Sequence, residues 1–282
     1  MIAIDGHTHI YSAIRPEYTP VTGGENLKQL VEPGACTVCS LCDPVGSDTF
    51  SRLRDLSDAD SGAANHAGCS VSTTSESTSL TMSKGNEASV VVIRGQQLVS
   101  SENLEVLAIG HTTNLKTGRP LHKTLDQARA AGAHMIIPWG AGKWIGTRGK
   151  LVSGKIQRQA CPGPHLGDND GGRPAVCRVP QFRFAAERGI KIISGSDPLP
   201  IAGDERRIGT YGMVIDGQLD TASPWQSIAS FLADPNVQPE TIGSNLRFAR
   251  FLLLQSKLRF KVLYGCDWFT RIRMLQWESN WS

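Results

Sequence analysis

Residues 121–140 read LHKTLDQARAAGAHMIIPWG, and this stretch decides the fold class. Its first half carries apolar residues at helical spacing, which predicts a helix that Gly132 would end. The apolar run Met135–Ile137 follows at once and predicts a short buried strand that stops at Pro138. Helix, glycine, strand and polar loop therefore follow one another within twenty residues.

The same order returns at residues 182–198, FRFAAERGIKIISGSDP. A helical segment ends at Gly189, the run Ile190–Ile193 predicts a strand, and a polar loop follows. Alternating helices and strands are typical of α/β folds with parallel strands. The chain has 282 residues, which suits one α/β barrel of about 250 residues. We therefore expect residues 1–282 to form a single barrel domain whose chemistry lies at the carboxyl ends of the strands.

Composition narrows the functional classes. Hydrophobic residues make up 40% and charged residues 20%, as in globular rather than disordered proteins. The net charge of +3 is small, so we expect no nucleic-acid partner. No apolar stretch is long enough to span a membrane, and no basic segment precedes an apolar one at the start. We expect a cytoplasmic protein whose seven cysteines are reduced.

Two segments fit this pattern less well. Near residues 57–87 the chain becomes rich in Ser and Thr, which predicts an inserted exposed hairpin or mobile loop. Cys36, Cys39 and Cys42 lie in a turn-rich segment at Cys-x-x-Cys-x-x-Cys spacing, with Cys69 further on. Four thiolates could hold zinc or an iron–sulfur cluster, which gives one hypothesis of a redox or cluster protein.

The first polar cluster, Asp5-Gly6-His7-Thr8-His9, directly follows a short apolar strand. Side chains two residues apart on an extended chain point to the same side, so His7 and His9 could reach one metal ion. Gly6 would let the backbone approach closely. The competing interpretation is a pair of surface histidines. We predict a divalent metal, with zinc, manganese and iron all compatible with these ligand types.

Asp197 ends the polar loop Ser194–Asp197 after the strand at 190–193. Its carboxylate could ligate the metal or accept a proton from water as a general base. A plain helix or turn cap is the alternative.

The loop after residue 138 carries glycines, Trp139 and Lys143, and Arg148 lies close behind. Backbone amides and cations in such a loop can cradle an anion. We predict that Lys143 has a catalytic role and that all three side chains contact substrate. An ordinary basic surface loop would look similar.

Two further clusters supply weaker candidates. Asp168 lies in His165–Asp170 and is a second acid–base candidate, although this stretch is also good turn chemistry. Arg173 follows it and could bind substrate. Arg206, in the run Asp204–Arg207, could pair with an anionic group, and a solvated charge run is the competing interpretation.

Four of these segments together resemble the polymerase-and-histidinol-phosphatase (PHP) family of metal-dependent phosphoesterases, and amidohydrolases share part of the pattern. Residues 5–9 match the opening D-x-H-x-H motif, and residues 195–197 match a late Gly-Ser-Asp-x-His. Residues 90–98 are similar to a strand that ends in Gly-x-Glu, and residues 121–139 to a helix, glycine and strand that ends in His-Pro. The resemblance covers most of residues 1–212.

The resemblance implies a distorted seven-stranded (β/α) barrel, up to three metal ions and attack by metal-activated water on a phosphorus centre. His7, His9 and Asp197 match its ligands. This chain departs from the pattern at three expected ligands, which are Gln97, Ile137 and Leu199 here. We therefore expect one metal on the three matching residues, joined by Asp168 or another histidine, or a pocket in which Lys143 and Arg148 replace metal charge.

Three hypotheses follow. The first is a metal-dependent hydrolase of a small anionic substrate, with a phosphoester favoured over an amide or lactone on the resemblance alone. The second is a barrel that binds a ligand through the Lys143 loop without turnover. The third is the cysteine-based redox protein.

Overall fold

The protein is described here by a computed structural model that covers residues 1–11, 19–58, 69–85, 89–157, 163–170, 178–201 and 203–263, with side chains to residue 257. The strands are β1 (Ile2–Thr8), β2 (Cys36–Asp43), β3 (Cys69–Thr73), β4 (Ser79–Lys84), β5 (Val90–Val99), β6 (Glu105–Ile109), β7 (His134–Pro138), β8 (His165–Asn169), β9 (Ile192–Gly195), β10 (Tyr211–Ile215) and β11 (Glu240–Gly243). The helices are α1 (Thr19–Lys28), α2 (Thr49–Asp58), α3 (Leu121–Ala130), α4 (Gly146–Gln157), α5 (Pro180–Ala186), the 3₁₀ helix η1 (Asp204–Arg207), α6 (Pro224–Ala233) and α7 (Phe248–Leu263).

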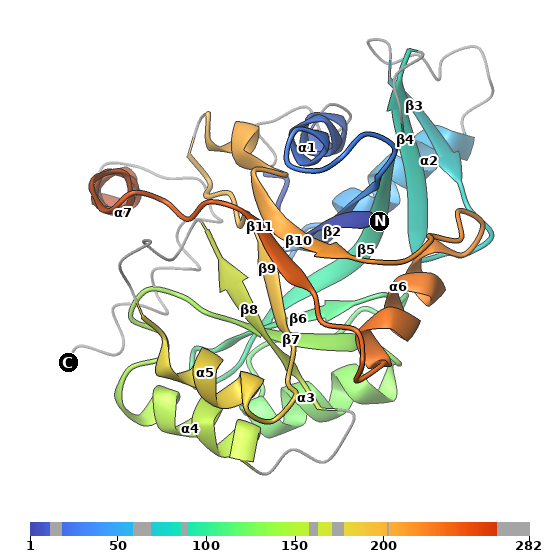
Figure 1. The fold of residues 1–282 in the computed structure, drawn as a ribbon. Coiled ribbons are helices and arrows are strands. Elements are labelled where there is room, and N and C mark those ends of the chain that lie inside the picture. Colours follow the sequence, from blue (N-terminus) through green and yellow to red (C-terminus); the bar gives the residue numbers. More distant parts are fainter. Residues whose placement is uncertain are drawn as a thin grey trace.

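The strands form one curved sheet in the order β11-β10-β1-β2-β5-β6-β7-β8-β9. Strands β1, β2 and β5 run parallel, as do β7, β8 and β9. Strand β9, at the end of this order, lies against β1, so the sheet is almost closed. The helices lie outside the sheet (Figure 1). The expected distorted, TIM-like α/β barrel is confirmed.

Strand β6 departs from the parallel pattern, because it is antiparallel to both β5 and β7. A turn of five residues joins β5 to β6 and is closed by a hydrogen bond from Ser100 N to Leu104 O of 2.8 Å. Such a short connection can only reverse the chain, since a parallel neighbour needs a long crossover. As a consequence, the amino end of β6 lies at the carboxyl ends of β5 and β7.

Two glycines allow β9 to approach β1. A Cβ atom on Gly6 would lie 2.5 Å from Ile193 Cγ2, and one on Gly195 would lie 2.4 Å from the His7 nitrogen. Either contact is shorter than real Cβ atoms show. The expected role of Gly6 in close backbone approach is therefore confirmed, and this approach brings the end of β9 beside the end of β1.

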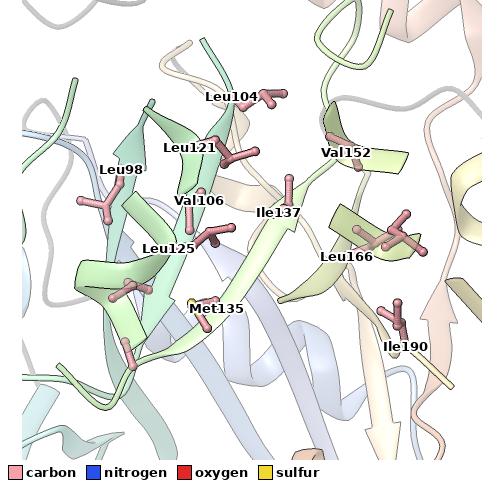
Figure 2. Packing of buried hydrophobic residues seen from close by; sticks show 14 of the residues in the cluster. Leu98, Leu104, Val106, Leu121, Leu125, Met135, Ile137, Val152, Leu166 and Ile190 are labelled. Atoms are coloured by element: carbon pink, nitrogen blue, oxygen red, sulfur yellow. The ribbon is translucent and has the colours of Figure 1, made fainter. Parts of the chain in front are cut away.

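Three apolar clusters fix the barrel. One fills its interior with residues from β1, β2, β5, β6, β7, β9 and β10, together with Ile228 and Leu232 of α6. A second lies between the sheet and α3, α4 and α5; Figure 2 shows Leu121 and Leu125 of α3 packed beside Val106 and Met135 of the strands. The third packs α1 and α2 on the sheet. Burial of these side chains is the main driving force for folding.

The Ser/Thr-rich segment contains a hairpin in its described part. Strands β3 and β4 pair antiparallel, with Val71 opposite Met82, and β4 then adds to β5. A hairpin is therefore observed for residues 69–84, but the expectation that it is exposed was wrong, because Leu80 and Met82 of β4 are fully buried. No helix among the described residues has the length and apolar character needed to cross a membrane.

Candidate metal centre

His7 and His9 meet at the carboxyl end of β1, and Asp197 reaches them from the turn after β9. Alternation along the strand places both imidazoles on one side, as the sequence predicts. Asp197 has a φ of 40°, a left-handed conformation that is uncommon for a residue with a Cβ atom. Its backbone N–H donates to the His7 carbonyl at 2.8 Å, which holds the turn in place.

The three side chains converge on one point. The Nε2 atoms of His7 and His9 lie 2.8 Å apart. Asp197 Oδ1 lies 3.8 Å from the first and 3.4 Å from the second. All three residues are buried, and they form the group of potential metal ligands found among the described residues.

Hydrogen bonds on the far side of each ring decide where the protons are. His9 Nδ1 lies 2.6 Å from the Cys42 carbonyl oxygen, which can only accept, so this nitrogen carries the proton. His7 Nδ1 lies 3.1 Å from Asn169 Oδ1. The amide of Asn169 is oriented because its Nδ2 donates to Trp139 O at 3.0 Å and to Asp197 Oδ2 at 3.2 Å. His7 Nδ1 is therefore a donor too.

With the Nδ1 of each ring acting as a donor, the Nε2 atom of each ring is the one directed toward the common point. Two Nε2 atoms that both carry a lone pair repel each other at 2.8 Å, and a cation bound by both nitrogen atoms would remove that repulsion. Burial lowers the pKa of His7 to about 4, although the charges of Asp197 and Glu105 act in the opposite direction. The ring is therefore neutral near pH 7 and available as a metal ligand. These residues fit a divalent ion with two imidazole ligands and one carboxylate ligand.

Asp5 holds the segments that carry the candidate ligands together through hydrogen bonds. Its carboxylate accepts hydrogen bonds from Ser196 N at 2.9 Å, Ser196 Oγ at 2.6 Å, Gly209 N at 2.8 Å and His7 N at 3.2 Å. Burial raises the pKa of Asp5 to about 6, and these four donors oppose that rise. Asp5 thus joins β1 to the turn that carries Asp197.

Asn169 is a functional candidate that the sequence did not reveal. It orients His7 and Asp197 together, from the end of β8. Its neighbours Gly167, Asp168 and Asp170 made this stretch look like a turn. The available signal was its position after Leu166, at the end of a strand too short to recognise.

The loop after β7 brings Lys143 to a second polar cluster inside the barrel mouth. Its ammonium forms an ion pair with Glu105 Oε1, and the same oxygen accepts from Gln97 Nε2 at 2.7 Å. Glu105, at the amino end of β6, was not singled out from the sequence. Arg148, in the first turn of α4, is partly buried and donates to Gly142 O in the preceding loop at 3.1 Å. Trp139 is partly buried against the apolar cluster between the sheet and α3, α4 and α5.

The other sequence candidates lie apart from the three ligands or outside the described residues. Asp168 Oδ2 accepts from Tyr211 Oη at 2.8 Å, and Asp168 is not part of the converging group found among the described residues. Arg206 is exposed on η1, whereas the adjacent Arg207 is buried in ion pairs with Asp170 and Asp204. Arg173 lies outside the described residues.

The three departures from the family pattern have different surroundings. Gln97 lies at the barrel mouth beside Glu105. Ile137 packs in the core beneath α3, α4 and α5 (Figure 2), and Leu199 packs in a small cluster with Leu246 and Leu254. Position 97 is therefore the departure that lies in a buried polar cluster, with Glu105 and Lys143.

The cysteine spacing falls on strand β2 rather than on turns. Cys39 packs in the outer cluster beneath α1 and α2, whereas Cys42 packs in the barrel interior. The two thiols lie on opposite faces of the strand, so they cannot bind one ion together. Burial raises the pKa of both thiols, which disfavours the thiolate that a metal needs.

Comparison with solved structures identifies proteins of similar fold. PsfC from Pseudomonas syringae PB-5123 superimposes with a TM-score of 0.52 and 12% identity, over 93% of this chain and 98% of PsfC. PfuEndoQ from Pyrococcus furiosus, a lesion-specific endonuclease, gives a TM-score of 0.50 and 12% identity, over 84% of this chain and 57% of the endonuclease. No family model matches the sequence, and no curated protein matches it.

These superpositions show a shared fold. They also correct one expectation. The exclusion of nucleic acid was wrong, because the fold is shared with an enzyme that acts on nucleic acid. The exclusion rested on the net charge of +3, and net charge describes the whole surface rather than the few residues at a barrel mouth.

Proposed function

We propose that this protein is a divergent member of the PHP family that hydrolyses a phosphate ester with a divalent metal ion held by His7, His9 and Asp197. The observation that carries the proposal is the pair of Nε2 atoms 2.8 Å apart, each made a lone-pair donor by the bond on its Nδ1. Zinc, manganese and iron all suit this ligand set. The similar fold of a lesion-specific endonuclease supports phosphate-ester chemistry over amide or lactone chemistry.

The bound ion would supply a Lewis acid and an activated water molecule. The chain's own residues do the rest of the work. The Cys42 carbonyl and Asn169 hold the two imidazoles in one tautomer and orientation. Asn169 also occupies Asp197 Oδ2, which leaves Oδ1 directed at the histidines as a ligand or a proton acceptor.

The basic loop would place the substrate. Lys143 has a side chain that is 18% exposed, so its ammonium can meet a phosphate oxygen while it remains fixed on Glu105. Trp139 precedes it on the same loop, Arg148 follows in the first turn of α4, and the exposed Arg206 stays a further candidate. Asp168 remains a second acid–base candidate through its hydrogen bond with Tyr211.

A substrate panel tests the proposal. Protein loaded with zinc, manganese or iron would be incubated with aryl phosphate mono- and diesters, duplex DNA with an abasic site, and aryl amides and lactones. We expect turnover of a phosphate ester that is lost in Asp197→Asn. Turnover of amides or lactones alone would replace the proposal with an amidohydrolase activity. Binding of phosphate without any turnover would support a ligand-binding barrel instead.

A further inference from the structure

The polar cluster beside the centre is formed by Gln97, Glu105 and Lys143. On β5, Gln97 has the same parity as Val91 and Ile93, and on β6 Glu105 has the same parity as Leu107 and Ile109. Those four apolar residues fill the barrel interior. Gln97 is 4% and Glu105 3% exposed, so both polar side chains face inward, above the apolar filling.

Lys143 is placed in this cluster by the shape of its loop. Its backbone N–H donates to Gly140 O at 2.9 Å, which closes a turn. A Cβ atom on Gly140 would lie 2.8 Å from Lys143 Cδ, so the aliphatic part of Lys143 lies over a residue that lacks a side chain. The ammonium then pairs with Glu105 inside the mouth of the barrel.

The cluster lies at the same end of the barrel as the histidine pair. His7 lies at the carboxyl end of β1, Gln97 lies toward the carboxyl end of the parallel strand β5, and Glu105 begins the antiparallel strand β6. A second buried carboxylate, from position 105, therefore faces the barrel interior at the end that holds the centre.

The amide of Gln97 adds an independent sign of a cation site. Its Nε2 donates to Glu105, whereas its buried Oε1 has no hydrogen-bond partner among the described residues. The Gln97 amide and the Glu105 carboxylate are in hydrogen-bond contact, and carboxylate and amide oxygens are suitable ligands for a divalent ion. In this chain an ammonium already occupies the Glu105 oxygen that such an ion would need.

We propose that the Lys143 ammonium, anchored on Glu105, takes the place of a second metal ion, so that the centre holds one metal ion and one fixed organic cation. This inference rests on the proposed function. The charges of Asp197 and Glu105 balance one divalent ion, and the ammonium then leaves one excess positive charge beside it. That excess suits a substrate phosphate, of which Lys143 would hold one oxygen while the metal holds another.

Metal stoichiometry tests the inference without reference to activity. The full chain, Lys143→Met, Lys143→Met/Glu105→Gln and the exposed-lysine control Lys150→Met would be dialysed against zinc and analysed for bound metal. We expect one equivalent in the wild type and the control, two in Lys143→Met because the ammonium no longer occupies Glu105 Oε1 beside the Gln97 amide, and one in the double variant. Lys143→Gln provides a second variant if Lys143→Met does not fold, as judged by circular dichroism.

Three results would overturn the inference, and they separate it from the proposed function. Two equivalents in the wild type would show that Lys143 does not exclude a second ion. One equivalent in folded Lys143→Met would show that the cluster is not a cation site. Both results leave the proposed hydrolase standing, whereas no metal in any of the proteins would overturn the proposed function and this inference together.

Discussion

The backbone N–H of Asp197 donates to the carbonyl oxygen of His7 at 2.8 Å, so two candidate metal ligands are joined through the main chain. This bond depends on the contact between β1 and β9, which leaves no room for a side chain at position 195. The site is therefore built into the closure of the barrel rather than carried by a separate loop.

The first prediction concerns that closure. In Gly195→Ala the new Cβ atom would lie 2.4 Å from the His7 nitrogen, and we expect overpacking to lower the free energy of unfolding by about 1–3 kcal/mol. The matched control is Gly154→Ala in α4, where a Cβ atom meets nothing within 4 Å. Urea unfolding measures both. Equal stability of the two variants would contradict the close approach of β1 and β9.

Asn169 carries the second prediction. Asn169→Ala removes the partner of His7 Nδ1 and of Asp197 Oδ2 while the three ligands stay in place. We expect the metal dissociation constant to rise by about 10–100-fold. Isothermal titration with zinc measures it, and Asn236→Ala, at an exposed position, is the control. Unchanged affinity in Asn169→Ala would show that Asn169 does not orient the ligands.

Arg207 carries the third prediction. It is buried with Asp170 and Asp204, and Arg207→Met would leave both carboxylates buried without their cation. We expect a loss of about 3–5 kcal/mol in the free energy of unfolding. Arg206→Met, at the exposed neighbouring position, should stay within about 0.5 kcal/mol of the wild type. A mild effect at position 207 would mean that the ion pairs contribute little.

A fourth prediction concerns acid stability and uses His134 and His165, whose ring centroids lie 4.7 Å apart. Burial lowers the pKa of His134 to about 4 and that of His165 to about 3, with nearby Lys191 acting in the same direction. In the unfolded chain both histidines have the ordinary pKa of 6.5. As the pH falls below 6.5, they therefore bind protons in the unfolded chain but stay neutral in the folded chain. Stability is then complete above pH 6.5 and is lost as the pH falls toward 4.

We expect this pair to contribute a slope of about 2 kcal/mol per pH unit between pH 6 and pH 4.5, close to one proton for each histidine. Urea unfolding of the wild type and of His134→Gln/His165→Gln across that range isolates the contribution, because all other groups are common to both proteins. Parallel stability curves for the two proteins would show that the histidines are not buried in the neutral form.

The sequence was sufficient for the parts of the site that obey strand periodicity. His7 and His9 are two residues apart on β1, and Asp197 follows β9, so the position of each relative to a strand end predicted their meeting. Asn169 and Glu105 were missed for physical reasons. Strand β8 is five residues long and rich in turn-forming residues, and β6 runs antiparallel, which brings its first residue rather than its last to the barrel mouth.

The fold shows the same division. The alternation of helix, glycine and strand at residues 121–140 predicted α3 and β7, because local spacing determines both elements. Strand β2 was hidden by its polar and cysteine residues, whose burial depends on contacts with α1 and with the barrel interior. The formation of β2 therefore depends on contacts between segments distant in the chain, which the local sequence does not reveal.

Metal content tests the central claim most directly. Wild type, His7→Ala/His9→Ala and His134→Gln/His165→Gln would be loaded with zinc, freed of excess metal and measured by elemental analysis. The two histidine pairs have ring centroids 4.6 Å and 4.7 Å apart, so the second is a matched control for the first. We predict one equivalent of metal in the wild type and the control and none in His7→Ala/His9→Ala. Equal metal content in all three proteins, or none in the wild type, would contradict a centre built on His7 and His9.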